Sequence, residues 1–202
     1  MDFFKQVGVK DEGLSYANKL PAGHVVITPS FGNDCSANAP PYTSHCTLGD
    51  AGYDQAGALL QHLHGTLNPR ADKPGGQIVR FKQRAFAPAS TGMAETALVY
   101  VPQACTSASA HCKVHVAIHG CVQSEESVGQ QFVTDTGFNA WADSNQMLVL
   151  YPQVNKSSNP ANPQGCRDWW GYTGGNYAKK SGPQLKAIMA MVKRLTQSPH
   201  SP

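Results

Sequence analysis

The chain has 202 residues and a mass of 21.6 kDa, the size of one compact domain. Its 16 basic and 13 acidic residues leave a formal net charge of +3, and charged residues make up only 14% of it, against about 25% in average proteins. A polyanion binder needs a strongly basic surface and a charge-driven disordered chain needs a high net charge, so we expect neither, and no nucleic acid partner. No run of about 18 apolar residues occurs, so we expect no membrane span and no membrane partner.

Cysteine usage indicates an oxidising compartment. The six cysteines stand at positions 35, 46, 105, 112, 121 and 166. None forms the Cys-x-x-Cys pair typical of zinc or dithiol redox sites, and an even number favours three disulfides, which persist in secreted or periplasmic proteins. The first residues, Met-Asp-Phe-Phe-Lys-Gln, lack the basic leader and apolar core of a signal peptide. We therefore expect that a leader was removed or that the true start lies upstream of Met1.

The first third of the chain predicts one strand, one loop and one helix. Apolar residues alternate with polar ones over 14–20, which predicts a short strand. Residues 31–50 are rich in Pro, Asn, Ser and Gly and carry a cysteine near each end, which indicates a loop whose two ends are linked to each other. Over 53–64, alanine and leucine recur at helical spacing near Asp54, whose carboxylate favours the positive end of a helix dipole. We expect this helix to pack on a sheet.

The remaining elements alternate between strand and helix after a linker at 66–76. Strands are predicted at 77–83, 97–101, 113–118 and 147–151, and helices at 136–145 and 183–197. This alternation predicts an α/β fold, in which helices cover a parallel sheet. Ligands of such sheets bind beyond the carboxyl ends of the strands. The strand that runs into His119 and Gly120 is therefore the first place to look for chemistry.

A His-Gly pair directly after a buried strand resembles the α/β-hydrolase loop that supplies a backbone N–H to the oxyanion hole. Glycine lets the backbone approach a developing oxyanion closely, and losing one such donor costs about 2.7 to 4 kcal/mol of transition-state stabilisation. On their own, His119 and Gly120 are explained more simply by an ordinary loop, because turns commonly need glycine.

Several separated motifs make the pattern specific. They stand at 119–124 (HGCVQS), 136–143 (TGFNAWAD), 150–153 (LYPQ) and 165–171 (GCRDWWG). In order and spacing they resemble the poly(3-hydroxybutyrate) depolymerase family. The same holds for Ala22-Gly23-His24, the cysteine-bounded loop after it, and Tyr53-Asp54. The resemblance covers essentially the whole chain.

The resemblance implies a secreted or periplasmic ester hydrolase with a circularly permuted α/β-hydrolase fold, in which nucleophile, acid and histidine precede the oxyanion-hole strand. It implies serine-type hydrolysis of poly(3-hydroxybutyrate) or related short-chain hydroxyalkanoate esters, without a cofactor. Residues 1–202 would then form a single, incomplete catalytic domain, namely its C-terminal part.

Three residues receive roles from the resemblance. His24 would be the base that takes the proton from a serine and returns it to the leaving alcohol, although a lone histidine more often lies idle on the surface. Cys121 would offer its backbone N–H to the oxyanion hole while its sulfur pairs with Cys166. Trp169 would pack on the polyester, with the alternative that one of the adjacent indoles, Trp169 or Trp170, belongs to the core.

The resemblance also implies two further disulfides, Cys35 with Cys46 and Cys105 with Cys112. A Cys-His protease is an alternative use of these residue types. Because a bonded Cys121 sulfur cannot attack a substrate, the implied disulfide disfavours that alternative.

Metal binding is another alternative. The closest pairs in the sequence are His62 with His64, His115 with His119, and His45 with Cys46. None joins two further ligands at the spacing of a zinc site, so no metal is expected.

The family places its nucleophile in a Gly-x-Ser-x-Gly elbow near the N-terminus, and no such motif occurs in this chain. The triad acid should precede His24, but Asp2 and Asp11 lie in contexts that do not match it. We therefore expect an N-terminal truncation that lacks the signal peptide, the nucleophile strand and the acid strand, and a chain that is inactive alone. The alternative from another class is a secreted, non-catalytic protein that binds polyester or a partner through Trp169.

Overall fold

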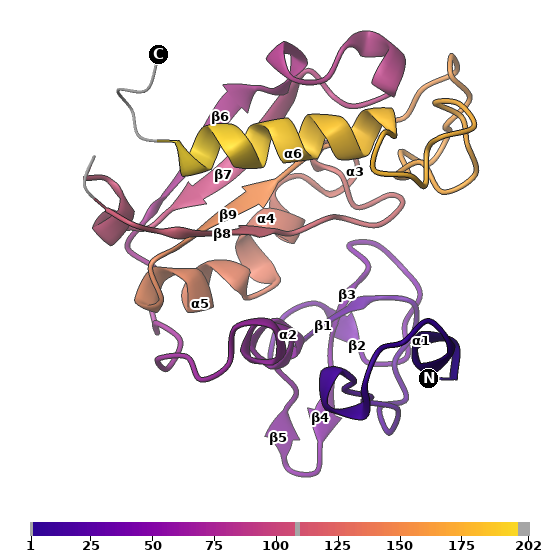
Figure 1. Cartoon of the computed structure of the whole chain (residues 1–202). Coiled ribbons are helices and arrows are strands. Elements are labelled where there is room, and N and C mark those ends of the chain that lie inside the picture. The colour runs from indigo at the N-terminus through magenta and orange to yellow at the C-terminus, as the bar shows by residue number, and fades with distance from the viewer. Residues whose placement is uncertain (1, 108–109, 198–202) are drawn as a thin grey trace.

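A four-stranded sheet is the centre of the computed structural model, which describes residues 2–107 and 110–197 (Figure 1). The strands are β6 (Gln77–Lys82), β7 (Thr96–Val101), β8 (Lys113–Val116) and β9 (Met147–Tyr151), in the spatial order β6-β7-β9-β8. β6 pairs antiparallel with β7, and β7 with β9, whereas β8 runs parallel to β9. β8 is therefore an edge strand of this sheet.

Strand β9 lies inside the sheet, and all five of its residues are buried. Its side chains alternate between two core clusters, with Val149 in one and Leu150 in the other. Helix α6 (Pro183–Thr196) covers the Leu150 face, and α4 (Gln131–Asp135) and α5 (Phe138–Ser144) cover the Val149 face (Figure 1). This layered arrangement confirms the α/β class predicted from the sequence.

A second, smaller sheet lies beside the first (Figure 1). It consists of β1 (Val26–Thr28), β2 (Asn33–Asp34) and β3 (Thr43–His45), in the order β1-β3-β2 with both pairs parallel. β4 (Thr47–Leu48) and β5 (Ala51–Gly52) form an antiparallel hairpin after it. The structure contains the disulfides Cys35–Cys46, Cys105–Cys112 and Cys121–Cys166, the pairs that the resemblance implies.

Helix α2 (Gln55–His64) joins the two sheets by packing on β1 and on α5. Asp54 caps it, since one carboxylate oxygen accepts from the Gly57 N–H at 2.8 Å and the other accepts from Trp141 Nε1 at 2.9 Å. A Cβ atom at Gly57 would lie 2.5 Å from the Trp141 ring, so glycine is what lets α2 approach α5. The predicted role of Asp54 at this helix start is therefore confirmed, and the same carboxylate also fixes the helix contact.

The other elements are short. They are α1 (Asp2–Gln6), α3 (Glu125–Val128) and the 3-10 turns η1 (Asp11–Gly13), η2 (Gln83–Ala85), η3 (Ala89–Thr91) and η4 (Gln103–Cys105). Within the described ranges, the structure has no helix with the length and apolar character needed to cross a membrane.

Two sequence predictions are wrong. Residues 14–20 form no strand, because no described strand pairs with them and Tyr16 points to solvent. The main sheet is not parallel throughout, because only η2 and η3 lie between β6 and β7. Antiparallel strands need no more than such a return loop, whereas the parallel pair β8 and β9 has the helical crossover that parallel pairing requires.

Candidate active site

A loop that we call the glycine loop, residues 118–123, begins two residues after the end of β8. The Gly120 N–H donates to Gln123 Oε1 at 2.9 Å, and the Val122 N–H donates to a backbone carbonyl at 2.8 Å. Between them, the Cys121 N–H has no acceptor in the part of the chain that the structure describes. The loop thus offers one unpaired backbone donor between two paired ones.

The backbone of the glycine loop is strained at Val122. This residue has a φ of +54°, in the left-handed region that β-branched residues rarely adopt. Such a conformation costs about 1 to 3 kcal/mol and persists only where the surroundings hold it. Here the Val122 N–H bond and the Cys121–Cys166 disulfide hold the chain on both sides.

His119 is part of the glycine loop, and its side chain is buried, with 1% of the residue exposed. Its Nδ1 lies 2.7 Å from the Gly120 carbonyl oxygen, and its Nε2 lies 3.1 Å from the Val154 backbone nitrogen. Burial, followed by the positive charge of Arg167, lowers the pKa of His119 to about 3. The imidazole is therefore neutral near pH 7 and is no acid–base group of the site.

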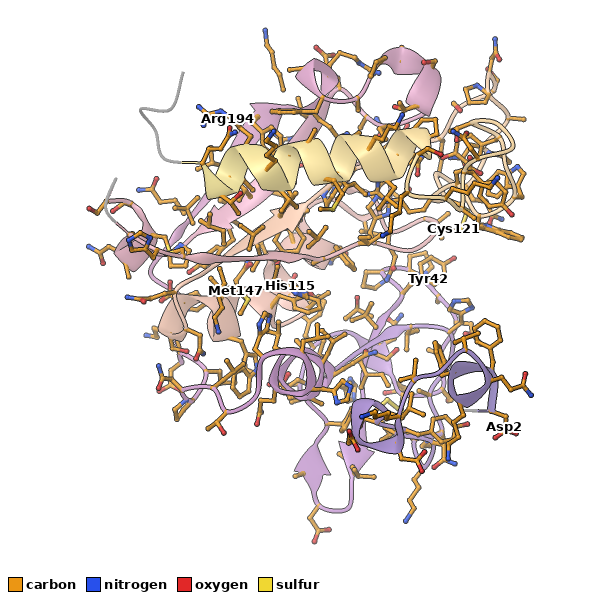
Figure 2. The ribbon with its side chains drawn as sticks, in the orientation of Figure 1. Asp2, Tyr42, His115, Cys121, Met147 and Arg194 are labelled. Carbon is orange, nitrogen blue, oxygen red and sulfur yellow. A yellow bond between two sulfur atoms is a disulfide. The ribbon has the colours of Figure 1, made fainter. Side chains whose placement is uncertain are left out.

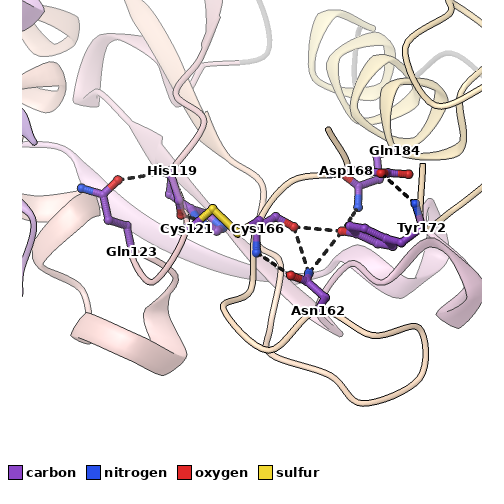
Figure 3. The surroundings of a disulfide bond; sticks show 9 residues. His119, Cys121, Gln123, Asn162, Cys166, Asp168, Tyr172 and Gln184 are labelled. Atoms are coloured by element: carbon purple, nitrogen blue, oxygen red, sulfur yellow. Dashed lines mark hydrogen bonds between the residues drawn. A yellow bond between two sulfur atoms is a disulfide. The ribbon is translucent and has the colours of Figure 1, made fainter. Parts of the chain in front are cut away.

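The Cys121–Cys166 disulfide ties the glycine loop to a second loop, residues 166–173, which we call the tryptophan loop (Figure 3). Fully buried Asn162 holds the Cys166 backbone from both sides, because its Oδ1 accepts from the N–H and its Nδ2 donates to the carbonyl, each at 2.9 Å. The Tyr172 hydroxyl donates to the same carbonyl at 2.9 Å. Cys121 is thus anchored to a fixed point.

Asp168 organises the tryptophan loop. Its carboxylate accepts from the backbone N–H groups of Gly171 at 2.6 Å, Tyr172 at 3.0 Å and Thr173 at 2.8 Å. Partial burial acts to raise the pKa of Asp168, but these hydrogen bonds, led by those from Thr173, outweigh it and hold the pKa below its usual value. The Asp168 N–H donates to Gln184 Oε1 on α6 at 3.1 Å, which ties the loop to the main core.

The tryptophan loop presents two indoles to solvent. Trp169 is 69% exposed and Trp170 is 41% exposed, and their rings meet edge to face with centroids 5.2 Å apart. The Trp170 ring continues to Tyr172, with centroids 4.8 Å apart. The alternative that one of the two indoles belongs to the core is therefore wrong.

His24 is exposed and precedes β1 on a segment held by the Cys35–Cys46 loop. The Gly23 N–H donates to the Cys35 carbonyl at 2.9 Å, and the His24 N–H donates to Asn38 Oδ1 at 2.6 Å. A Cβ atom at Gly23 would lie 2.5 Å from a backbone oxygen, which explains the glycine before His24. The imidazole has no hydrogen-bond partner among the described residues.

Gln123 links the His24 segment to the glycine loop. It is 5% exposed and donates from Nε2 to the Tyr42 carbonyl at 2.7 Å; that carbonyl also accepts from the Val26 N–H at 2.9 Å. Figure 2 shows Tyr42 and Cys121 on neighbouring segments where the two sheets meet. Sequence reasoning missed this role because the partner of Gln123, the Tyr42 carbonyl, lies 81 residues earlier in the chain.

The histidines considered as metal ligands have other surroundings. His115 stacks on Phe138 with ring centroids 5.1 Å apart, and burial, followed by the charge of His64, lowers the pKa of His115 to about 4. No group of three or more His, Cys, Asp or Glu residues in the described ranges lies close enough to hold a metal ion.

Known proteins resemble this chain over nine-tenths of its length. It is 46% identical over 184 residues, 90% of the chain, to the poly(3-hydroxybutyrate) depolymerase of Delftia acidovorans. It is 38% identical over 195 residues to the polyhydroxybutyrate depolymerase of Talaromyces funiculosus. The crystal structure of the PHB depolymerase from Penicillium funiculosum superposes on 90% of the chain with a TM-score of 0.81 and 36% identity. The chain is a homologue of these depolymerases.

The homology covers only part of each depolymerase. The chain spans 35% of the Delftia depolymerase, 56% of the Talaromyces depolymerase and 59% of the Penicillium structure. A structure of a PHB depolymerase complexed with an R3HB trimer matches 87% of the chain and 57% of that protein, with a TM-score of 0.77 and 37% identity. No protein-family profile matches the chain.

Proposed function

We propose that this chain is the base, oxyanion-hole and substrate-binding part of a serine-type hydrolase that acts on poly(3-hydroxybutyrate) or related short-chain hydroxyalkanoate esters. The observation that carries the proposal is the Cys121 N–H, unpaired among the described residues and held between paired neighbours at the end of β8. Homology to PHB depolymerases, one of them complexed with an R3HB trimer, supports the substrate class.

Cys121 supplies the first part of the chemistry. When a serine attacks the ester carbonyl, the oxygen becomes an oxyanion, and the Cys121 N–H donates a hydrogen bond to it. Gly120 has no side chain to block this approach. A donor that is already in place needs no reorganisation during the reaction, and removing one typically lowers kcat by about 10²- to 10³-fold.

His24 supplies the proton transfers. Its imidazole takes the proton from the serine hydroxyl as that oxygen attacks, and gives it to the leaving alcohol. It then takes a proton from the water that attacks the acyl group, and gives this proton to the departing serine oxygen, which restores the starting state. Its exposure and the lack of a ring hydrogen bond within the described residues leave both nitrogens available for this cycle.

Trp169 supplies a flat apolar surface for the methyl-bearing units of the polyester. The indole is exposed, while the backbone around it is fixed by the Asp168 carboxylate. The ester chain therefore meets a rigid surface next to the glycine loop, to which the tryptophan loop is covalently joined.

The nucleophile and the triad acid lie, in this proposal, on a segment outside these residues. No Gly-x-Ser-x-Gly motif occurs in the sequence, and β8 is an edge strand that can pair with a further strand. Residues 1–202 are then one part of a catalytic domain and are inactive alone. The three disulfides support a secreted or periplasmic location.

The test compares the purified chain alone with a joined polypeptide, in which a depolymerase segment carrying the Gly-x-Ser-x-Gly motif and the triad acid precedes it. Hydrolysis of p-nitrophenyl butyrate and of poly(3-hydroxybutyrate) granules is measured for both. We expect the chain alone to match buffer and the joined polypeptide to turn over both substrates.

Two control variants of the joined polypeptide sharpen the result. Replacing the motif serine by alanine, or His24→Ala, should abolish turnover. Turnover by the chain alone would overturn the assignment of the nucleophile to another segment. An inert joined polypeptide would overturn the proposal that the protein is a hydrolase. If the chain then binds granules and Trp169→Ala does not, the result favours the non-catalytic polyester-binding alternative.

A further inference from the structure

We infer that His119 is a positioning residue that sets the direction of the Cys121 N–H by donating a hydrogen bond to the carbonyl of the same peptide group. The inference rests on the proposed function, because it concerns the oxyanion donor. It assigns to a buried histidine a task that neither the triad chemistry nor the sequence motifs require.

The geometry of the peptide group carries the first step. The Gly120 carbonyl and the Cys121 N–H belong to one planar trans unit, so they point in opposite directions. His119 Nδ1 lies 2.7 Å from the Gly120 oxygen on the buried side of the loop. Holding that oxygen inward therefore directs the Cys121 N–H away from the core.

The tautomer of His119 follows from its second contact. The Val154 backbone N–H can only donate, and it lies 3.1 Å from His119 Nε2. That nitrogen must therefore carry the lone pair, and in a neutral imidazole the proton is then on Nδ1. Burial and the facing guanidinium of Arg167 keep the ring neutral, so the Nδ1–H donor to the Gly120 carbonyl persists near pH 7.

Neighbouring contacts leave the peptide few other orientations. Gln123 accepts from the Gly120 N–H at 2.9 Å, and the Val122 N–H donates to the Gln164 carbonyl at 2.8 Å. If the Gly120–Cys121 peptide flipped, its carbonyl would face the site and would repel an oxyanion. The same flip would leave the buried His119 Nδ1–H without an acceptor.

Two amide variants separate the two hydrogen bonds of the ring. In His119→Asn, the short amide places its nitrogen near the Nδ1 position, so it keeps the donor to the Gly120 carbonyl and loses the acceptor for Val154. In His119→Gln, the longer amide reaches the Nε2 position, so it keeps the acceptor and loses the donor. His62→Gln, at an exposed histidine on α2, is the control for replacing a histidine elsewhere.

The first readout is NMR on the 15N-labelled chain and needs no ester hydrolysis. We expect the His119 ring to show the Nδ1–H tautomer and not to titrate between about pH 5 and pH 8. The sequential NOE between the Gly120 Hα protons and the Cys121 amide proton reports the peptide orientation. It should match the parent chain in His119→Asn and in the control, and should change in His119→Gln.

The second readout is kcat and KM of the same variants in the joined polypeptide. His119→Gln should lower kcat by about 10²- to 10³-fold with little change in KM, as loss of an oxyanion donor does. The kcat of His119→Asn should be at least about tenfold higher than that of His119→Gln. A titrating His119, or equal NOE patterns in both amide variants, overturns the inference. Failure of the hydrolase proposal is distinct, because the unsubstituted joined polypeptide would then be inert while the NMR result stands.

Discussion

Asp168→Asn is the substitution that tests most directly how the tryptophan loop, the proposed substrate surface, is held. The variant keeps the shape of the side chain, but its amide nitrogen can no longer accept from the Thr173 N–H, which now bonds the carboxylate at 2.8 Å. It also removes the charge that strengthens the bonds from Gly171 and Tyr172. Hydrogen bonds to charged groups contribute about 1.5 to 3 kcal/mol each, so we expect a loss of about 2 kcal/mol. For a domain of this size that lowers Tm by roughly 4 to 8 °C.

The pH dependence identifies the carboxylate as the cause. The folded-state pKa of Asp168 lies below its unfolded value of about 3.9, so the stabilisation is complete above that value and is lost as pH falls through the folded pKa. The difference in Tm between the parent chain and Asp168→Asn should therefore be full at about pH 6 and shrink steadily below about pH 4.

The assay is thermal unfolding followed by circular dichroism between about pH 2.5 and pH 7, with exposed Asp72→Asn as the matched control. A difference in Tm that stays constant over this range would refute the argument, because the charge of Asp168 would then play no part. A difference below about 1 °C at pH 6 would refute it as well, because the Thr173 N–H would have lost nothing.

The remaining predictions concern binding and the ties between the loops. Trp169→Ala should weaken co-sedimentation with poly(3-hydroxybutyrate) granules about tenfold or more, since one buried apolar side chain is worth about 1.5 to 3 kcal/mol; an equal loss in exposed Leu63→Ala would count against a specific role. Gln123→Leu removes the partner of the Gly120 N–H and one of the two donors to the Tyr42 carbonyl, so urea unfolding should show a loss of about 2 to 4 kcal/mol, and a loss below about 0.5 kcal/mol would contradict the bridging role. Replacing Cys121 and Cys166 together by serine opens a link across 45 residues and should cost about 4 kcal/mol by loop entropy, again measured by urea unfolding, with unchanged stability as the contrary outcome.

Local patterns account for the elements that the sequence predicts well. Residues 147–151 are predicted as a strand and form β9, and the amphipathic spacing of 183–197 matches α6 to within one residue. Local patterns do not predict whether neighbouring strands run parallel or antiparallel, because this depends on the segment that connects them. The strand predicted over 14–20 fails for the same reason, since an alternating pattern forms a strand only where another strand pairs with it.

The candidate site divides in the same way. His24, Cys121 and Trp169 are proposed from motifs that are visible in the sequence alone. Gln123 and Asp168 stand inside two of those motifs, yet their tasks depend on partners that only folding brings near, such as a carbonyl 81 residues away for Gln123. Positioning residues give no spacing pattern in the sequence, because they bond backbone groups that only folding brings near them.

The disulfide at Cys121 has a consequence for when the site is complete. A bond between Cys121 and Cys166 forms only where thiols are oxidised. In a reducing cytosol the glycine loop would keep its hydrogen bonds but lose its covalent tether to the tryptophan loop. In the proposed site, the Cys121 N–H and the two indoles would therefore be joined covalently only after the chain reaches an oxidising compartment.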